Sequence, residues 1–328
     1  MGQLQIPWEE ELAQLRAPSP QLARAVVMVR PVDFAFNEET GADNVFQHRL
    51  GLAPQEVTRR ALAEFDAMVE RLCSHNLDVL VMDKRHDEHV TPDAVFPNNW
   101  FSTGHDGSVY VYPMHTPNRR RERRVEQLSR LLLDNGFRID QLSWAGHPLE
   151  EELILEGTGV MIFDHPRRRV YAARSHRCHP TALYRYARLR GLDDVVLFDT
   201  ADSHGVPIYH TNVMMSVGER VAVICGESLH RDDERASVLA KLAEHHEVID
   251  ISFEQVEQHF CGNILQLAAR DGTPLMVMSE QAWNGFTPEQ QRTLERHGQP
   301  VVNPIPTIEA VGGGSCRCML AEVFLPRQ

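Results

Sequence analysis

The sequence has few basic residues and no long apolar run, and each shortage excludes a class of protein. Its 33 Lys and Arg residues stand against 46 Asp and Glu residues, which gives a formal net charge of −13. This charge repels polyphosphate, so we expect no nucleic-acid partner. No apolar stretch approaches the roughly 18 residues that span a bilayer, and Met1–Glu10 lacks the basic-then-apolar pattern of a signal peptide. We therefore expect a cytoplasmic protein without a membrane partner.

Cysteine is also scarce, and it is spread thinly over a long chain. The six cysteines are Cys73, Cys178, Cys225, Cys261, Cys316 and Cys318. Small secreted domains carry a much denser set, which they use as a disulfide framework. We therefore predict free thiols.

Short apolar strands alternate with amphipathic helices along the sequence. The predicted helices cover Pro54–His75, Asn118–Asn135, Pro180–Arg190, Asp232–His245, Phe253–Phe260 and Pro288–His297, the last with Thr287 as its cap. The predicted strands cover Ala25–Arg30, Asp78–Asp83, Ala94–Ser102, Val109–Pro113, Val160–Asp164, Val170–Arg174, Val195–Asp199, Val221–Cys225, Glu247–Ile251, Ile264–Ala268, Pro274–Met278 and Met319–Phe324.

A unit of strands and one helix, roughly 60 to 70 residues long, recurs about five times without readable identity between the copies. This repetition indicates a radial, pseudo-symmetric α/β assembly, and a doubly wound sheet is the alternative because periodicity does not fix strand direction. No Ser/Gly hinge or low-complexity tract divides the chain. We therefore predict a single catalytic domain over residues 1–328.

Four segments combine reactive side chains with strand ends or glycines. They are Pro92–Phe101, Leu155–Gly159, Tyr209–Ser216 and Gly312–Met319. Three consecutive glycines are usually kept where the backbone turns sharply or a ligand approaches closely, so a cysteine after them is a candidate nucleophile. Together the segments supply a nucleophile, a base and an orienting carboxylate.

The order of Pro-Asp-x-Val-Phe, Glu-Gly-x-Gly, His-x-Asn and a late glycine-rich cysteine resembles the arginine deiminase, dimethylarginine dimethylaminohydrolase and amidinotransferase (pentein) superfamily. The likeness covers the whole chain, and members of the superfamily are five-bladed α/β propellers. The segments Phe96–Phe101, His210–Gly218 and Gly312–Met319 are most similar to the bacterial citrulline-utilisation hydrolase branch. The resemblance also implies that the last strand closes the ring onto the N-terminal unit.

The resemblance implies a catalytic set of Cys318 as nucleophile, His210 as acid and base, and Glu156 as orienting carboxylate. Cys316 is then a buried neighbour. The thiolate would be stabilised by Arg317, by a bound cationic substrate or by protonated His210.

On the substrate side the resemblance assigns Asp93 to the α-amino group, and Arg120 and Arg177 to the carboxylate. Asn98 and Asn99 stand where relatives that grip a guanidinium carry acids. An amide offers a donor and an acceptor without charge, so it suits a neutral ureido group at least as well. Asn37, Glu38 and Asn44 are expected to form a flap over the site.

The function that follows is hydrolysis of a C–N bond in citrulline or an N-methylated arginine through a covalent cysteine intermediate. An amidinotransferase, an arginine deiminase and a non-enzymatic binding propeller are the alternatives. No cofactor is expected, and no metal, since Cys316-x-Cys318 and His176–His179 lack the spacing that completes a zinc site. The expected partner is a small guanidino or ureido amino acid, and a homodimer is left open.

Overall fold

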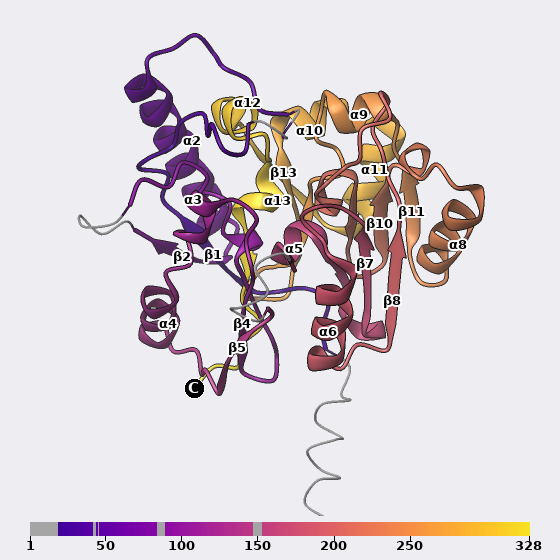
Figure 1. The fold of residues 1–328 in the computed structure, drawn as a ribbon, viewed down its shortest axis with the longest axis horizontal. Coiled ribbons are helices and arrows are strands. Elements are labelled where there is room, and N and C mark those ends of the chain that lie inside the picture. The colour runs from indigo at the N-terminus through magenta and orange to yellow at the C-terminus, as the bar shows by residue number, and fades with distance from the viewer. Residues whose placement is uncertain (1–18, 42–43, 45, 84–88, 147–152) are drawn as a thin grey trace, which may run out of the picture.

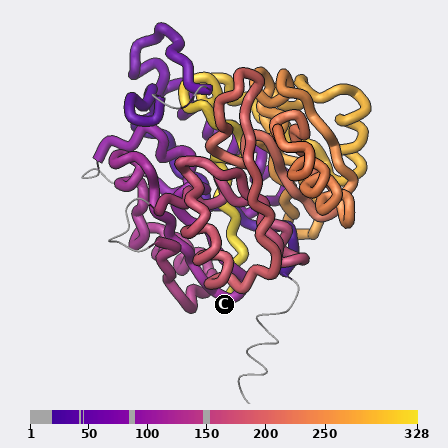
Figure 2. Tube along the Cα trace, turned by 45° about the vertical axis from the view of Figure 1, so that its right-hand side comes forward, coloured from indigo at the N-terminus to yellow at the C-terminus, as the bar shows by residue number. Residues whose placement is uncertain are grey.

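Five small sheets are arranged as a ring in the computed structural model, which describes residues 19–41, 44, 46–83, 89–146 and 153–328 (Figures 1 and 2). Each sheet has three strands. Helices α2 (Pro54–Ser74), α4 (Val125–Asp134), α6 (Pro180–Arg190) and α8 (Asp232–Ala243) lie on the outside of the ring (Figure 1). The predicted five-unit α/β propeller is therefore confirmed, and the doubly wound sheet is wrong.

Every sheet repeats one topology. In the third sheet, β6 (Ile162–Asp164) pairs antiparallel with β7 (Arg169–Ala173), and β7 pairs parallel with β8 (Asp194–Phe198). The helix α6 makes the crossover between β7 and β8, as a parallel pair requires. The predicted bounds of α6 are confirmed at both ends.

The other sheets follow the same order of strands. They comprise β3 (Phe101–Thr103), β4 (Ser108–Val111) and β5 (Gln141–Trp144); β9 (Met215–Val217), β10 (Val221–Ile224) and β11 (Glu247–Asp250); β12 (Leu265–Ala268), β13 (Pro274–Ser279) and β14 (Gln299–Asn303); and β15 (Ala321–Glu322), β1 (Ala25–Val29) and β2 (Asp78–Met82). The remaining helices are α3 (Pro117–Arg120), α9 (Phe253–Glu257), α10 (Glu280–Gly285), α11 (Pro288–His297) and α12 (Pro306–Gly312), with 3₁₀ turns η2 (His165–Arg167) and η3 (Gly226–Ser228).

The ring is closed by the C-terminal strand. β15 pairs antiparallel with β1, with Val26 opposite Glu322 and Val27 opposite Ala321. The backbone N–H of Val323 also donates to the carbonyl of Ala25 at 2.8 Å. The N-terminal sheet thus takes its first strand from the other end of the chain, so the expected closure is confirmed.

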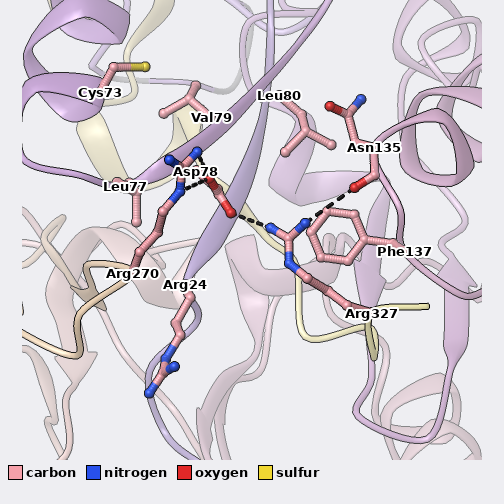
Figure 3. A pocket seen from close by; sticks show the side chains of 10 residues that line it. All are labelled: Arg24, Cys73, Leu77, Asp78, Val79, Leu80, Asn135, Phe137, Arg270 and Arg327. Carbon is pink, nitrogen blue, oxygen red and sulfur yellow. Dashed lines mark hydrogen bonds and ion pairs between the residues drawn. The ribbon is translucent and has the colours of Figure 1, made fainter.

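A surface groove marks this closure at the end of the sheet where β1 and β2 begin. Arg270 from the β12–β13 turn and Arg327 from the C-terminal segment both contact the carboxylate of Asp78 (Figure 3). Arg327 also lies over the Phe137 ring at 4.4 Å. These contacts join three sheets at their rims, and their exposure limits what each adds to stability.

Apolar side chains fill the spaces between the sheets and the outer helices. All five residues of β1 are buried. On α2 the buried side chains Val57, Ala61, Phe65, Met68 and Leu72 follow one another at intervals of three or four, which places them on one face. α2 therefore packs by an apolar stripe into a core that it shares with β1, a strand buried on both faces.

The structure corrects two predicted elements. The helix predicted over Asn118–Asn135 is two helices, α3 and α4, because the chain leaves the helical path where buried Glu122 turns back to pair with Arg119 at 3.0 Å. The strand predicted over Ala94–Ser102 begins only at Phe101, because Pro97–Asn99 forms a 3₁₀ turn, η1.

Some elements escaped prediction. Strand β5 is largely exposed and polar, β9 has three residues, and β14 contains Pro300, which argues against a strand. Helices α10 and α12 are each shorter than two full turns. None of the described helices is long and apolar enough to cross a membrane.

The capping box predicted at Thr287 is present, since its hydroxyl accepts from the Gln290 N–H at 3.3 Å and Gln290 Oε1 accepts from the Thr287 N–H at 2.9 Å. We expect Thr287→Ala to lower the free energy of unfolding by about 1 kcal/mol, because the helix loses a cap. Urea denaturation measures this. Thr287→Ser keeps the hydroxyl and should retain most of the stability; equal losses in both variants would contradict the assignment.

Candidate active site

Short helical turns precede the first strands of four sheets, and they meet near the middle of the ring (Figure 1). They are η1, α5 (Gly157–Val160), α7 (Thr211–Met214) and α13 (Cys316–Met319). α5 contacts η1 and α7, and α13 contacts η1. The loop before β12 occupies the corresponding place in the fifth sheet. The repeated topology thus gathers segments that are far apart in sequence.

Glu156 and His210 each stand directly before one of these turns, and their side chains are paired. Nε2 of His210 lies 2.7 Å from Oε2 of Glu156. Arg177 Nη1 donates to both carboxylate oxygens at 3.1 and 3.2 Å, and the backbone N–H of His115 donates to Oε1 at 2.9 Å. The carboxylate is completely buried and fully hydrogen-bonded.

These contacts set the ionisation of the pair. Burial opposes ionisation of Glu156, but Arg177 and His210 outweigh it and hold the pKa of the carboxyl well below its usual range. Burial also lowers the pKa of His210, although Glu156 acts in the opposite direction. The ground state is therefore a carboxylate beside a neutral imidazole at neutral pH.

The Cys318 thiol lies in α13 and is bonded by two amides. Nδ2 of Asn263 is 3.2 Å from Sγ, and Nδ2 of Asn212 is 3.4 Å from it. Burial raises the pKa of this thiol, while Asn263 opposes the shift. In the free protein the sulfur is thus a protonated thiol held by neutral donors.

Neither Cys316 nor Arg317 faces the same space. Cys316 is completely buried, and burial raises its pKa well above the usual range. Arg317 donates to the Leu320 carbonyl at 3.0 Å and pairs with Glu322 at 3.1 Å. Arg317 was one of the groups expected to stabilise the thiolate, but its guanidinium interacts with Leu320 and Glu322 instead.

A small cavity of about 30 Å³ lies among these groups. Of the sequence-predicted site residues, Cys318, His210, Asp93, Asn99 and Arg177 line it. Glu156 lies behind His210, Asn98 is buried beside the cavity without lining it, and Arg120 is outside.

The arginine at the cavity is Arg119 and not Arg120. Arg119 is buried, pairs with Glu122 at 3.0 Å and donates to Asn99 Oδ1 at 3.3 Å. Arg120 instead donates to the carbonyls of Met114 and His115, at 2.9 and 3.2 Å. The prediction was wrong by one residue, because a helical turn points successive side chains in different directions.

Asp93 is the acid of the cavity wall. Its Oδ2 accepts from Asn37 Nδ2 at 2.7 Å and from Thr40 Oγ1 at 2.8 Å, whereas Oδ1 has no partner among the described residues. Burial raises the pKa of Asp93, and Arg119 opposes this. One carboxylate oxygen thus remains available to a ligand.

The expected flap is present in part. Asn44 lines the cavity, and Asn37 reaches it through Asp93. Glu38 is exposed and pairs with Arg49, so it faces away. Residues 42, 43 and 45 lie outside the described residues.

The two predicted amides differ in their surroundings. Asn99 lines the cavity; its Oδ1 accepts from Arg119, which leaves Nδ2 without a partner among the described residues. Asn98 is completely buried, and neither of its amide atoms has a partner in the described ranges. A Cβ at Gly159 would lie 2.1 Å from Nδ2 of Asn99, so the glycine makes room for this amide.

The terminal glycines also make room. Gly313 has φ +63, and a Cβ there would lie 2.6 Å from Asn44 Nδ2; a Cβ at Gly312 would lie 2.6 Å from the ring of Phe96. The strand predicted from Met319 begins only at Ala321, because Cys318 and Met319 belong to the helical turn α13. The positive φ of Gly313 confirms the predicted sharp turn.

Sequence analysis missed Asn212 and Asn263 as neighbours of the thiol, along with Thr40, Gln47 and Tyr209 in the cavity wall. Asn212 stood within the His-x-Asn pattern. Asn263 lies shortly before β12, the first strand of its sheet, and Asn212 lies in the same way shortly before β9. Aligning the repeats by their first strands is the signal that could have found it.

A family model described as "N,N dimethylarginine dimethylhydrolase, eukaryotic" matches residues 30–325. The chain belongs to this family. It is therefore a hydrolase of the dimethylarginine-hydrolase type within the pentein superfamily, as the resemblance implied. A search among curated proteins gave no match.

Several solved structures share the fold at low identity. The N-terminal domain of ArgZ, an arginine dihydrolase from cyanobacteria, is 16% identical with a TM-score of 0.66, covering 91% of this chain and 97% of that domain. A DDAH from Pseudomonas aeruginosa complexed with citrulline is 12% identical with a TM-score of 0.62, covering 92% and all of that chain. AgrE, in a complex with ornithine and NAD⁺, is 17% identical with a TM-score of 0.66, and this chain spans 40% of its length.

No three His, Cys, Asp or Glu side chains gather into a candidate metal set within the described ranges.

The helix that leads into the glycines carries a titratable group. Glu309 is 2% exposed and accepts from Ser315 Oγ at 2.6 Å, and burial raises its pKa to about 7. The folded protein thus holds this proton more tightly than the unfolded chain, so the stabilising contribution is complete below about pH 4.5 and is lost as pH rises to about 7.

We expect the free energy of unfolding to lose up to about 3 kcal/mol from this group across that window. In Glu309→Gln the free energy of unfolding should fall less between these pH values, as measured by urea denaturation at several pH values. The exposed Glu289 supplies the control, since Glu289→Gln should leave the slope unchanged. An unaltered slope in Glu309→Gln would show that Glu309 ionises normally.

Proposed function

We propose that this chain hydrolyses the ureido group of citrulline through a covalent intermediate on Cys318. The observation that carries the proposal is the uncharged amide nitrogen of Asn99, which has no partner among the described residues and belongs to the wall of the cavity that Cys318 also lines. Arg119 fixes the Asn99 amide with Nδ2 as the free donor. Asn212 gives its nitrogen to Cys318, which leaves Oδ1 as the free acceptor.

A ureido group has one oxygen that needs donors and nitrogens that need acceptors, so a free amide donor and a free amide acceptor complement it. A buried polar atom without a partner costs roughly 1 to 3 kcal/mol, and a ligand that supplies the partner recovers that cost. The Asn99 amide in the cavity wall thus favours a neutral, planar group as the ligand.

A guanidinium would need a carboxylate to compensate its charge. Glu156 is completely buried and already accepts from Arg177, His115 and His210. Asp93 is the acid that retains an unpartnered oxygen in the described part of the wall. Neither acid touches Cys318, so the charge balance also favours citrulline over arginine.

The amino-acid end of the substrate has matching groups. The free Oδ1 of Asp93 would accept from the α-ammonium, and Arg119 and Arg177 would hold the carboxylate. These contacts would fix the substrate chain so that its ureido carbon points toward Cys318. Holding two reacting groups in the right geometry supplies a large share of the rate enhancement of many enzymes.

In the proposed reaction His210 takes the proton of the Cys318 thiol, the thiolate forms a C–S bond to the ureido carbon, and the bond from that carbon to the chain nitrogen breaks. A proton from His210 converts the departing nitrogen to the amine of ornithine. His210 then takes a proton from water, which attacks the S-carbamoyl group and restores the thiol. Citrulline and one water thus give ornithine, carbon dioxide and ammonia.

Two relatives support the proposal in kind. An ArgZ N-terminal domain has been solved covalently bound to a reaction intermediate, and the Pseudomonas DDAH was solved as a cysteine-to-serine variant complexed with citrulline. Both are other proteins, with 15% and 12% identity to this chain.

The second candidate substrate is an N-methylated arginine, which the matching family favours by its description. The same Cys318, His210 and Glu156 would then release dimethylamine and leave citrulline. Transfer of the intermediate to an added amine would indicate an amidinotransferase instead.

Mass spectrometry of reactions with citrulline, arginine, homoarginine, methylated arginines and agmatine tests the proposal. We expect ornithine from citrulline to be the fastest product, and we expect Cys318→Ala to abolish it while Cys316→Ala retains it. Full turnover by Cys318→Ala on every substrate would overturn the covalent mechanism. Arginine giving citrulline faster than citrulline gives ornithine would overturn the substrate assignment.

The amide at position 99 generates a separate prediction. We expect Asn99→Asp to lower kcat/KM for citrulline by about 10 to 100-fold, because it replaces the free donor with an acceptor, and to favour guanidinium substrates. Asn98→Asp makes the same change at the neighbouring residue, whose side chain does not line the cavity. It should shift the ratio of citrulline to arginine turnover less than Asn99→Asp does. Equal ratios of citrulline to arginine turnover in both variants would show that Asn99 does not read the substrate.

A further inference from the structure

We propose that Asn263 is a catalytic residue whose side-chain amide stabilises the Cys318 thiolate. This inference rests on the proposed nucleophile and adds a residue to it. Among the described residues, the side chains that hydrogen-bond Sγ are those of Asn212 and Asn263; both donate through Nδ2, and the Asn263 Oδ1 lies 3.6 Å from the sulfur as an acceptor of the thiol proton. The shortest of them comes from Asn263, at 3.2 Å.

The orientation of the Asn263 amide is fixed by a second acceptor. Its Nδ2 also donates to the backbone carbonyl of Asn212 at 2.8 Å. A flipped amide would place Oδ1 against that carbonyl, which pairs two acceptors. The nitrogen therefore faces both the carbonyl and the sulfur, and one N–H is aimed at each.

The loop is built to bring this amide close. A Cβ at Gly262 would lie 2.3 Å from the Val213 carbonyl oxygen, so only glycine lets the loop before β12 pack against α7 at this distance. Asn263 is completely buried, and its backbone N–H donates to Phe260 at 2.9 Å. The donor is thus held in place before any substrate binds.

A thiolate at this position needs such a donor. Burial disfavours the charged sulfur, Arg317 is paired with Glu322, and the neutral state of His210 supplies no positive charge. Amide donors favour the thiolate over the thiol, because an N–H bonds more strongly to an anion. Preorganised dipoles in a dry site also need no rearrangement when the charge forms.

Alkylation of Cys318 by iodoacetamide, followed by mass spectrometry of its peptide over a range of pH in the ligand-free full chain, tests this role. We expect Asn263→Asp, which keeps the size and replaces the donor with a carboxylate oxygen, to raise the apparent pKa of alkylation by at least one pH unit. That is about a tenfold loss of rate at neutral pH. The exposed Asn284 is the matched control, because Asn284→Asp makes the same change in charge outside the site.

A folded Asn263→Asp variant with an unchanged alkylation profile would overturn the proposal. If near-UV circular dichroism shows that this variant does not fold, Asn263→Ser is measured instead, and an unchanged profile there overturns it equally. The measurement uses no substrate, so failure of citrulline turnover would contradict the proposed function alone. An unchanged profile alongside citrulline turnover would contradict only the role of Asn263.

Discussion

A carboxylate buried without compensation would cost several kcal/mol, and the middle of this ring contains one in Glu156. The compensation comes from three places: Arg177 after β7, the His115 N–H after β4, and His210 before α7. The three sheets that contain β4, β7 and β9 therefore have to keep their relative positions for the carboxylate to keep its hydrogen bonds. The orientation of His210 in the cavity follows from the same requirement, so fold and site share one constraint.

The free protein holds its reactive groups in uncharged forms. Burial acts against the thiolate of Cys318 and against the imidazolium of His210 alike. Moving a proton from one to the other would create both charges inside the cavity, where their attraction is stronger than in water. Amide donors on the sulfur and a carboxylate on the imidazole each favour the charged partner. The ion pair thus becomes accessible where neither ion alone would be.

Local patterns predicted α6 and the Thr287 cap because each depends on a few adjacent residues. The order of motifs predicted the ring and the gathering of Cys318, His210 and Glu156, since equivalent turns in a repeated unit converge. What failed depended on contacts that no local pattern contains. Arg119 replaces Arg120 because Glu122 turns back into the core, and Asn263 meets the thiol because Gly262 admits a distant backbone.

The repeated turns also explain why amides surround the sulfur. Asn99, Asn212 and Asn263 each lie shortly before the first strand of their own sheet, and the last two reach the sulfur from neighbouring sheets. Acids in these places would repel a forming thiolate and would need a cationic ligand to balance them. Amides impose neither condition, and they place donors and acceptors around a planar group. The repeat thus places the neutral amides of Asn212 and Asn263 against Cys318, and under the proposed function this links the choice of substrate to the chemistry of the nucleophile.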